Sequence, residues 1–272
     1  MGRKTTKTKK NTSTTDTNIP DQHDLPNLQY STTGRVSVVL PSYNEKENIV
    51  EAIERISNAL KTDLYEIIII DDNSPDLTWK LAQDLQNPKV RVIRRMRERG
   101  LASALDRGIQ EANGSIIVWM DCDLGLPPED VPKLVSHLNA HNDIVVGSRY
   151  APHGKDNRAK WRAAMSWVFN LYASCILGFY ARDYTSGFIA VKKEVTDKIH
   201  FSPHGFGEYF AEFLYKAHQH KYHILEVGYI YNYRKGGKSK LDTSFWHLLK
   251  AGAQYGWRIL KIRFGKEKNQ QD

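Results

Sequence analysis

The sequence predicts an α/β fold in which a mostly parallel, Rossmann-like sheet is flanked by helices. Short runs rich in β-branched residues alternate with segments whose apolar residues recur at helical spacing. The 272 residues are enough for one or two domains with a substantial core. A hydrophobic content of 40% and a charged content of 26% are typical of a globular protein.

The predicted strands and helices alternate along the chain. Strands are expected at residues 36–40, 66–70, 90–93, 115–120, 143–147 and 222–230. Helices are expected at residues 45–60, 77–85 and 101–112, from Pro127 onward, and up to about residue 216. The first helix has apolar residues at helical spacing, namely Ile49, Ile53, Ile56 and Leu60. The third ends at the helix-stop pair Asn113-Gly114. This alternation predicts βαβ units.

The fourth predicted strand ends in two carboxylates. The uncharged run Ser115–Met120 is followed by Asp121-Cys122-Asp123. Because side chains alternate along an extended chain, Asp121 and Asp123 leave the strand on the same side. Ligands of open α/β sheets bind beyond the carboxyl ends of the strands. The pattern therefore predicts a site for a hard divalent cation that carries a diphosphate. A solvated turn is the alternative.

The loops after the first two strands carry polar and aromatic groups. No Gly-x-Gly-x-x-Gly follows a strand and no Gly-x-x-x-x-Gly-Lys-Ser/Thr occurs, which argues against a dinucleotide site and a P-loop. Tyr43, in the loop of residues 41–45, can lie against a base or ribose. Asp71 or Asp72 can accept hydrogen bonds from a nucleoside. Turn and N-cap chemistry is the alternative for the two aspartates.

The charge of the chain indicates an anionic partner. The formal charge of +8 favours binding to a nucleotide, a phospholipid or a nucleic acid. Two cysteines provide neither a disulfide framework nor a metal cluster. Residues 1–34 are predicted to be a disordered, basic, Thr-rich tail, since they contain few large apolar groups. They also lack the apolar core of a secretory signal, so an intracellular protein is expected.

Seven motifs, in this order along residues 35–241, resemble those of the family 2 inverting glycosyltransferases. Within that family they look like the dolichyl- or polyprenyl-phosphate mannose synthases. The motifs are Pro41–Glu45, Asp71–Asp76, Arg99–Ala104, Met120–Asp123 with Pro127–Glu129, Gly147–Tyr150, Thr185–Phe188, and Tyr233-Arg234 with Lys238–Lys240.

The resemblance implies a GT-A fold with a C-terminal acceptor-binding part. It also implies transfer of mannose from GDP-mannose to dolichyl or other polyprenyl phosphate, with inversion and with Mg²⁺ or Mn²⁺. By position it assigns nucleotide-sugar binding to Pro41, Tyr43, Glu45, Asp71, Asp72 and Asp121. It assigns the metal to Asp121 and Asp123, and the phosphates to Arg149, Ser186, Arg234 and Lys240. Of these, the catalytic residues are expected to be Asp123, Arg149 and Arg234.

Two positions depart from the family pattern. Gly125 stands where relatives often carry a polar residue, two positions beyond the second metal aspartate. A second arginine, usual in the helix after Gly147–Tyr150, would fall near Trp167. Its place is expected to be taken by a nearby basic residue: Arg158, Lys160 or Arg162.

Two segments suggest contact with a membrane surface. Residues 163–180 carry no charge, but Ser166, Asn170 and Ser174 form a polar stripe, so an amphipathic helix at the surface or in the core is expected. Residues 244–264 are predicted to be a second amphipathic helix, in a C-terminal part at 242–272. Its polar face would consist of His247, Lys250, Gln254, Arg258 and Lys261. Packing of this helix in the core is the alternative.

The expected localisation follows from the lipid acceptor. The protein should be cytoplasmic and attach peripherally to the cytosolic face of a membrane, directly or through a separate membrane-embedded subunit. That membrane would be the endoplasmic reticulum in a eukaryote and the plasma membrane in a prokaryote. Two other functions stay open. One is hexosyl transfer from another donor, such as UDP-glucose. The other is nucleic-acid binding, suggested by charge alone without a helix-turn-helix, zinc or RNP signature.

Overall fold

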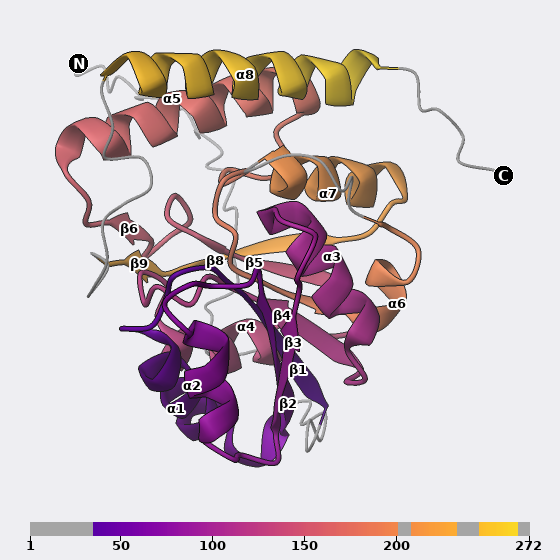
Figure 1. The fold of residues 1–272 in the computed structure, drawn as a ribbon. Coiled ribbons are helices and arrows are strands. Elements are labelled where there is room, and N and C mark those ends of the chain that lie inside the picture. Colours follow the sequence, from indigo (N-terminus) through magenta and orange to yellow (C-terminus); the bar gives the residue numbers. More distant parts are fainter. Residues whose placement is uncertain (1–34, 201–207, 233–244, 266–272) are drawn as a thin grey trace, which may run out of the picture. The chain divides into compact units, whose positions relative to one another are not determined.

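The computed structural model describes residues 35–200, 208–232 and 245–265, with side chains from residue 252 onward in the last range. Its main sheet has the strand order β3-β2-β1-β4-β7-β5-β8 (Figure 1). These strands are β1 Val36–Ser42, β2 Leu64–Asp71, β3 Val90–Arg94, β4 Ile116–Trp119, β5 Ile144–Ser148, β7 Ile189–Lys192 and β8 Ile224–Gly228. A separate parallel pair consists of β6 Lys155–Asp156 and β9 Ile230–Tyr231.

The helices flank this sheet. They are α1 Ile49–Leu60, α2 Thr78–Asp84, α3 Leu101–Glu111, α4 Val131–Ser136, α5 Lys160–Leu177, α6 Lys193–Thr196, α7 Glu208–Gln219 and α8 Phe245–Phe264. Short 3₁₀ turns span Lys61–Asp63 and Pro128–Asp130. The predicted α/β class is confirmed, with small shifts at the ends of elements. The largest shift is in α1, which begins at Ile49 because residues 45–48 form a turn.

All neighbouring strands of the main sheet are parallel except β7, which runs antiparallel to both β4 and β5. The sequence analysis did not predict β7. Its first residue, Ile189, pairs with Trp119 near the end of β4 and with Val146 in β5. Because β7 runs in the opposite direction, the segment that precedes it lies at the carboxyl ends of its neighbours. The motif Thr185–Phe188 thereby joins the edge of the sheet where ligands are expected.

The strands are buried on both faces, which explains their nearly continuous apolar sequences. Val39 and Ile70 belong to one apolar cluster, whereas Val38 and Ile69 belong to the cluster on the other side. The first cluster contains residues of α3, α5 and α7, and the second contains residues of α1 and α4. Side-chain alternation along each strand therefore divides the core into two layers.

Helices α5 and α8 lie side by side over the first of these layers (Figure 1). The rings of Phe169 and Tyr255 are 5.8 Å apart, and the Tyr172 hydroxyl donates a hydrogen bond of 3.1 Å to the carbonyl of Gly256. Ile259 of α8 is fully buried. A Cβ at Gly252 would lie 2.7 Å from the Phe169 ring, so glycine allows this close approach. Part of α8 therefore packs as a core helix.

The polar stripe of α5 faces the protein. Asn170 and Ser174 are buried, and the Asn170 side chain accepts a hydrogen bond from the Tyr184 N–H and donates one to Thr185. The apolar side of α5 is turned outward, with exposed Trp161, Trp167, Val168 and Leu171. Within the described ranges, no helix has both the length and the apolar character needed to cross a membrane.

On the predicted polar face of α8, Arg258 is partly exposed and reaches α7. Its guanidinium forms an ion pair with Glu208, a buried residue at the start of α7. Gln254 and Lys261 are exposed, together with Trp257 and Phe264. His247 and Lys250 lie in the part of α8 whose side chains are not described. The outward side of α8 thus mixes aromatic and polar groups.

Candidate active site

Asp121 and Asp123 follow β4 at the carboxyl edge of the sheet. The carboxylate of Asp123 is buried, and its Oδ1 accepts a hydrogen bond of 2.9 Å from the N–H of Gly125. Asp121 is half-buried. The acid pair therefore lies partly inside the fold, because the loop after β4 folds back over Asp123.

Asp71 holds the loops after β1 and β2 together. It is fully buried, and it accepts hydrogen bonds from the Ser42 hydroxyl at 2.9 Å and from the Ser74 N–H at 2.7 Å. The hydroxyl of Ser74 donates to the same carboxylate at 2.6 Å. These bonds fix the two loops relative to each other, and the assignment of Asp71 to the nucleoside stays a prediction.

Asp72 is also occupied by the fold. Its carboxylate accepts hydrogen bonds from Arg95 Nε at 2.7 Å and from the Gly100 N–H at 2.8 Å. Arg95 is buried and was not singled out from the sequence. Gly100 has a φ of 135°, a conformation that favours glycine. Asp72 therefore positions the start of α3, and its assignment as a nucleoside contact stays a prediction.

Pro41, Tyr43 and Glu45 remain accessible, since all three are half-buried. Their loop is held by hydrogen bonds of 3.0 Å from the Asn44 N–H to Ser74 and from the Glu45 N–H to Thr78. The guanidinium of Arg99, an exposed residue, lies 5.6 Å from the centre of the Tyr43 ring. Arg99 is the first residue of the Arg99–Ala104 motif, but the sequence alone indicated no role for it. It adds a positive charge beside the predicted nucleoside contacts.

Arg149 follows β5 and is buried in an ion pair. Its Nε and one terminal nitrogen bond the two carboxylate oxygens of Asp183 at 2.8 and 2.7 Å. The same terminal nitrogen bonds the Thr185 hydroxyl at 2.6 Å. Burial acts to lower the pKa of Arg149, but Asp183 outweighs it, and the pKa is raised. Two of its three guanidinium nitrogens are therefore bonded within the fold, and the phosphate-binding role of Arg149 stays a prediction. Only its other terminal nitrogen points elsewhere, 3.7 Å from Asp156.

Ser186 is turned toward the backbone of β5. Its hydroxyl donates a hydrogen bond to the carbonyl of Gly147 and accepts one of 3.3 Å from the Phe188 N–H. The side chain is buried and helps to fix the start of β7. Its acceptor-phosphate contact stays a prediction. Arg234 and Lys240 lie outside the described residues.

Arg158 lies beside the same network. Its Nε donates to Asp156 at 2.9 Å, and its guanidinium is 4.9 Å from the centre of the Tyr231 ring. Arg158, one of the three basic residues expected to replace the missing arginine, contacts the ion-pair network around Arg149 through Asp156. Arg162 instead lies over the Trp161 ring at 5.1 Å.

The acid pair fits a divalent cation that is shared with a diphosphate. Among the residues that the structure describes, there is no cluster of three or more His, Cys, Asp or Glu side chains that could hold a metal ion by itself. Mg²⁺ is commonly bound by one or two carboxylates together with substrate phosphates and water. Asp121 and Asp123 match this type of site, because the oxygens of the ligand complete the coordination.

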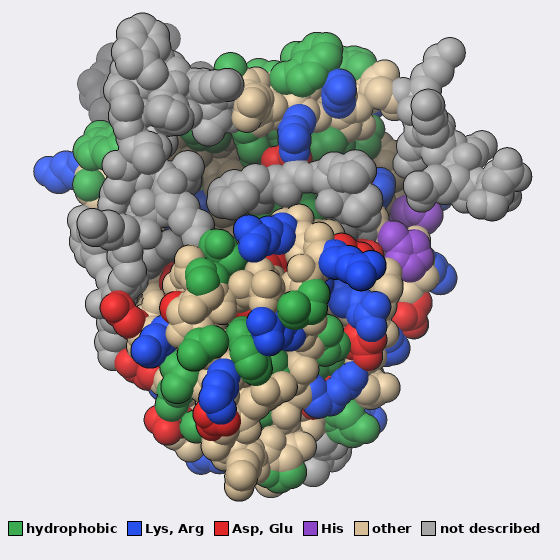
Figure 2. All heavy atoms as spheres, viewed as in Figure 1, with side chains coloured by type: hydrophobic (Ala, Val, Ile, Leu, Met, Phe, Trp, Pro, Cys, Tyr) green, Lys and Arg blue, Asp and Glu red, His purple; other side chains and the backbone are tan. Residues whose placement is uncertain are grey.

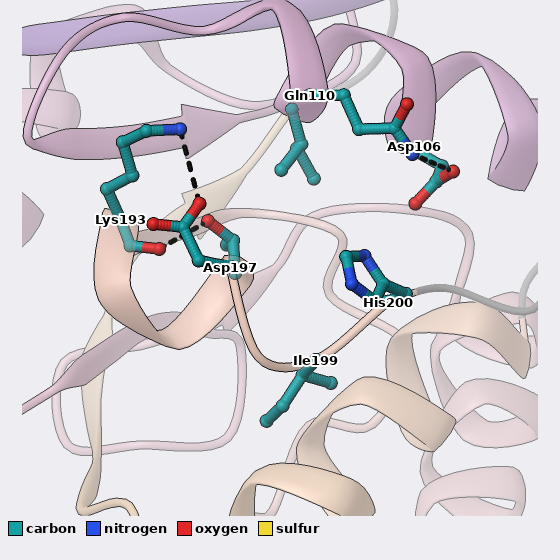
Figure 3. Close-up of a pocket in the computed structure, with 8 residues that line it drawn as sticks. Asp106, Gln110, Lys193, Asp197, Ile199 and His200 are labelled. Atoms are coloured by element: carbon teal, nitrogen blue, oxygen red, sulfur yellow. Dashed lines mark hydrogen bonds and ion pairs between the residues drawn. The ribbon is translucent and has the colours of Figure 1, made fainter. Parts of the chain in front are cut away.

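A separate cavity of about 210 Å³ lies between α3 and α6 (Figure 3). Charged groups in its wall are paired within one element. Lys193 pairs with Asp197 at 3.3 Å, and Gln110 bonds Asp106 at 2.8 Å. None of the residues assigned to the donor, metal or acceptor lines this cavity.

The family model described as glycosyl transferase family 2 matches residues 37–200, which include the acid pair, Arg149 and Ser186. The chain belongs to glycosyl transferase family 2. A dolichol-phosphate mannosyltransferase of Pyrococcus furiosus is 42% identical to it over 76% of the chain and 59% of the relative. The match thus spans less than two thirds of that relative's length.

A second relative is the polyprenol monophosphomannose synthase of Mycolicibacterium smegmatis. It is 32% identical over 78% of the chain and 83% of its own length. Among solved structures, glucosyl-3-phosphoglycerate synthase of Mycobacterium tuberculosis, in complex with Mn²⁺ and UDP, has a TM-score of 0.66. It covers 85% of this chain and 80% of its own, at 22% identity, and supports the GT-A fold.

Proposed function

We propose that this protein transfers a mannosyl group from GDP-mannose to dolichyl or another polyprenyl phosphate, with inversion at the anomeric carbon. The observation that carries the proposal is the acid pair Asp121 and Asp123 beside the accessible loop of Pro41, Tyr43 and Glu45 at one edge of the sheet. Two relatives that are 42% and 32% identical carry names of polyprenyl-phosphate mannosyltransferases. Those names support the choice of sugar and acceptor.

The donor would occupy the carboxyl edge of the sheet. Tyr43 and Arg99 would contact the nucleoside, and Asp121 and Asp123 would hold Mg²⁺ or Mn²⁺ with the diphosphate. The ion, when bound, acts as a Lewis acid that stabilises the charge on the leaving diphosphate.

The acceptor requires little proton transfer. A phosphate monoester is largely ionised at neutral pH, so it needs positioning and charge neutralisation more than a catalytic base. Arg158 lies near the acid loop through Tyr231 and can provide positive charge. Arg234 and Lys240, whose positions are not described, are proposed as further phosphate contacts. A single displacement at the anomeric carbon inverts its configuration.

The outer surfaces of α5 and α8 suit a membrane surface. Trp161, Trp167 and Leu171 are exposed on α5, and Trp257 is exposed on α8. Hydrophobic and basic side chains are both visible over α8 (Figure 2). Aromatic residues beside cationic ones favour binding to anionic headgroups. We infer peripheral attachment to the cytosolic face, where a polyprenyl phosphate would be presented. A separate membrane-embedded subunit is the alternative means of attachment.

The test is transfer by the full-length protein to dolichyl phosphate in anionic vesicles with Mn²⁺. Radiolabelled GDP-mannose should give a labelled lipid, and UDP-glucose should give little. NMR of the product should show a β-mannosyl linkage, since the donor linkage is α. Preference for UDP-glucose would support the other hexosyl transfer. A single-stranded oligonucleotide at physiological salt should not bind, and tight binding would revive the nucleic-acid hypothesis.

A further inference from the structure

Gly125 and Tyr231 share one space beside the acid pair. A Cβ built on Gly125 would lie 2.8 Å from the Tyr231 hydroxyl oxygen, 2.9 Å from its Cζ and 3.1 Å from Asp123 Oδ1. Contacts below 3.0 Å essentially never occur for real Cβ atoms. The phenol of Tyr231 therefore stands where a side chain at residue 125 would begin. Any larger residue at position 125 would force the phenol of Tyr231 to shift.

The backbone of Tyr231 is held on both sides. In the β6–β9 pair, Tyr231 stands opposite Asp156, and its carbonyl accepts a hydrogen bond of 3.1 Å from the Asn157 N–H. The next residue, Asn232, donates its N–H to the carbonyl of Gly125 at 3.1 Å. The second bond joins the Tyr231 segment directly to the loop of the acid pair. The position of the ring is therefore set by main-chain contacts.

The surroundings of the ring are cationic, whereas those of its hydroxyl are acidic. The guanidinium groups of Arg158 and Arg149 lie 4.9 and 5.9 Å from the ring centre. The hydroxyl, at the opposite end of the side chain, lies next to Gly125 and Asp123. A phenol can both donate and accept a hydrogen bond. The Tyr231 hydroxyl thus provides a hydrogen-bond donor where the diphosphate and its metal would bind.

We propose that the Tyr231 hydroxyl is part of the donor site and donates a hydrogen bond to the diphosphate held with the metal at Asp121 and Asp123. It supplies, from a distant part of the chain, the polar group that residue 125 lacks. This inference rests on the proposed function, since it assumes that a metal and a nucleoside diphosphate bind at the acid pair.

The first test is Tyr231→Phe, which removes one oxygen atom. The matched control is Tyr222→Phe, which changes a half-buried tyrosine next to His220, before β8. Mn²⁺ binding in the presence of GDP is measured by electron paramagnetic resonance of the free ion. Tyr231→Phe should weaken it about tenfold or more, the usual effect of losing a hydrogen bond to a charged group. Tyr222→Phe should bind like wild type.

Two further measurements separate this role from a structural one. The thermal unfolding midpoint of Tyr231→Phe should equal that of wild type, and its GDP affinity should change less in EDTA, where no metal holds the diphosphate at the acid pair, than with Mn²⁺. Wild-type Mn²⁺–GDP affinity in Tyr231→Phe would overturn the inference alone. Absence of Mn²⁺–GDP binding by the wild-type protein would overturn both the inference and the proposed function.

The second test uses Gly125→Ala. In the wild-type background its Cβ should displace the phenol and weaken Mn²⁺–GDP binding about as much as Tyr231→Phe does. In a Tyr231→Ala background the phenol is absent and only the 3.1 Å contact with Asp123 Oδ1 remains, so Gly125→Ala should cause a much smaller further loss. Such non-additivity is expected of residues that act through one contact. Independent, additive losses would contradict the shared role of Gly125 and Tyr231.

Discussion

Arg149 and Asp183 form a two-pronged ion pair in the interior, with N–O distances of 2.8 and 2.7 Å. The Asp183 side chain is fully buried, and that of Arg149 is 3% exposed. Asp183 also accepts the backbone N–H of Arg149 at 3.0 Å. The pair therefore joins the end of β5 to the segment that leads into β7.

This pair predicts that Arg149→Lys lowers stability as well as activity. Lysine lacks the planar fork that bonds both oxygens of Asp183. Lysine keeps the charge but leaves one buried bond to Asp183 unmade, which typically costs about 1–3 kcal/mol. The free energy of unfolding, measured with urea, should fall by about this amount. The control is Arg107→Lys, in an exposed pair with Glu111, which should change it by less than about 1 kcal/mol. Unchanged stability of Arg149→Lys together with reduced turnover would instead support a phosphate-binding role for Arg149.

If Asp121 and Asp123 hold the metal, replacing either aspartate should reduce metal-dependent transfer. Asp121→Asn and Asp123→Asn remove a negative charge while keeping an oxygen, so Asp123→Asn can still accept the Gly125 N–H. Transfer should fall on the order of a hundredfold or more, the usual effect of losing an electrostatic contact to the transition state. Asp84→Asn, which alters an exposed pair with Lys80, is the control and should behave as wild type. Wild-type transfer by either acid-pair variant in metal-free buffer would refute the metal assignment.

The contacts of Glu66 predict that its carboxylate contributes to the free energy of unfolding in a pH-dependent way. Burial acts to raise its pKa, but hydrogen bonds from Arg91, the Asn113 N–H and Ser37 outweigh burial and lower it. A lowered folded-state pKa gives stability that is present above the unfolded value of 4.5 and is lost as pH falls through the folded value.

The test compares urea unfolding of Glu66→Gln and wild type at neutral and acid pH. At pH 7 the variant should be less stable by about 2 kcal/mol. The difference should narrow below pH 4.5, as wild-type Glu66 becomes protonated. Glu54→Gln, at an exposed position of α1, serves as control. A difference that stays constant with pH would show that charge on Glu66 contributes nothing.

The outward face of α5 predicts binding to anionic vesicles. Trp167 and Leu171 are 54% and 42% exposed. Replacing both with Ser should reduce cosedimentation with vesicles at least tenfold, because burying each large apolar side chain contributes about 1.5–3 kcal/mol. Tyr65→Ser, at a 49% exposed position at the start of β2, is the control. Equal cosedimentation of the wild type and the Trp167/Leu171 double variant would exclude this face of α5 as a vesicle-binding surface.

Point variants are preferable to removal of α8. Deleting everything after Leu241 would uncover the core, because Ile259 is fully buried and Tyr255 packs on Phe169. A loss of vesicle binding by such a truncated protein would then result from unfolding as readily as from removal of a membrane-binding surface.

The alternation of most strands and helices, and the acid pair at the end of β4, followed from sequence patterns, whereas β7 did not. These features depend on local spacing: apolar residues at a helical or strand period, and two acids separated by one residue. Such patterns state which side chains are polar and on which side of an element they stand. They do not state which distant group each side chain meets.

The tertiary structure decided those partners. It placed β7 between β4 and β5, buried Asp71 and Asp72 among loop donors, and turned the polar stripe of α5 inward. Arg149 meets Asp183 across 34 positions of sequence, and Tyr231 meets Gly125 from an even greater separation. Charge, burial and close packing in three dimensions determine whether an arginine binds a ligand or an aspartate, and no one-dimensional pattern contains those distances.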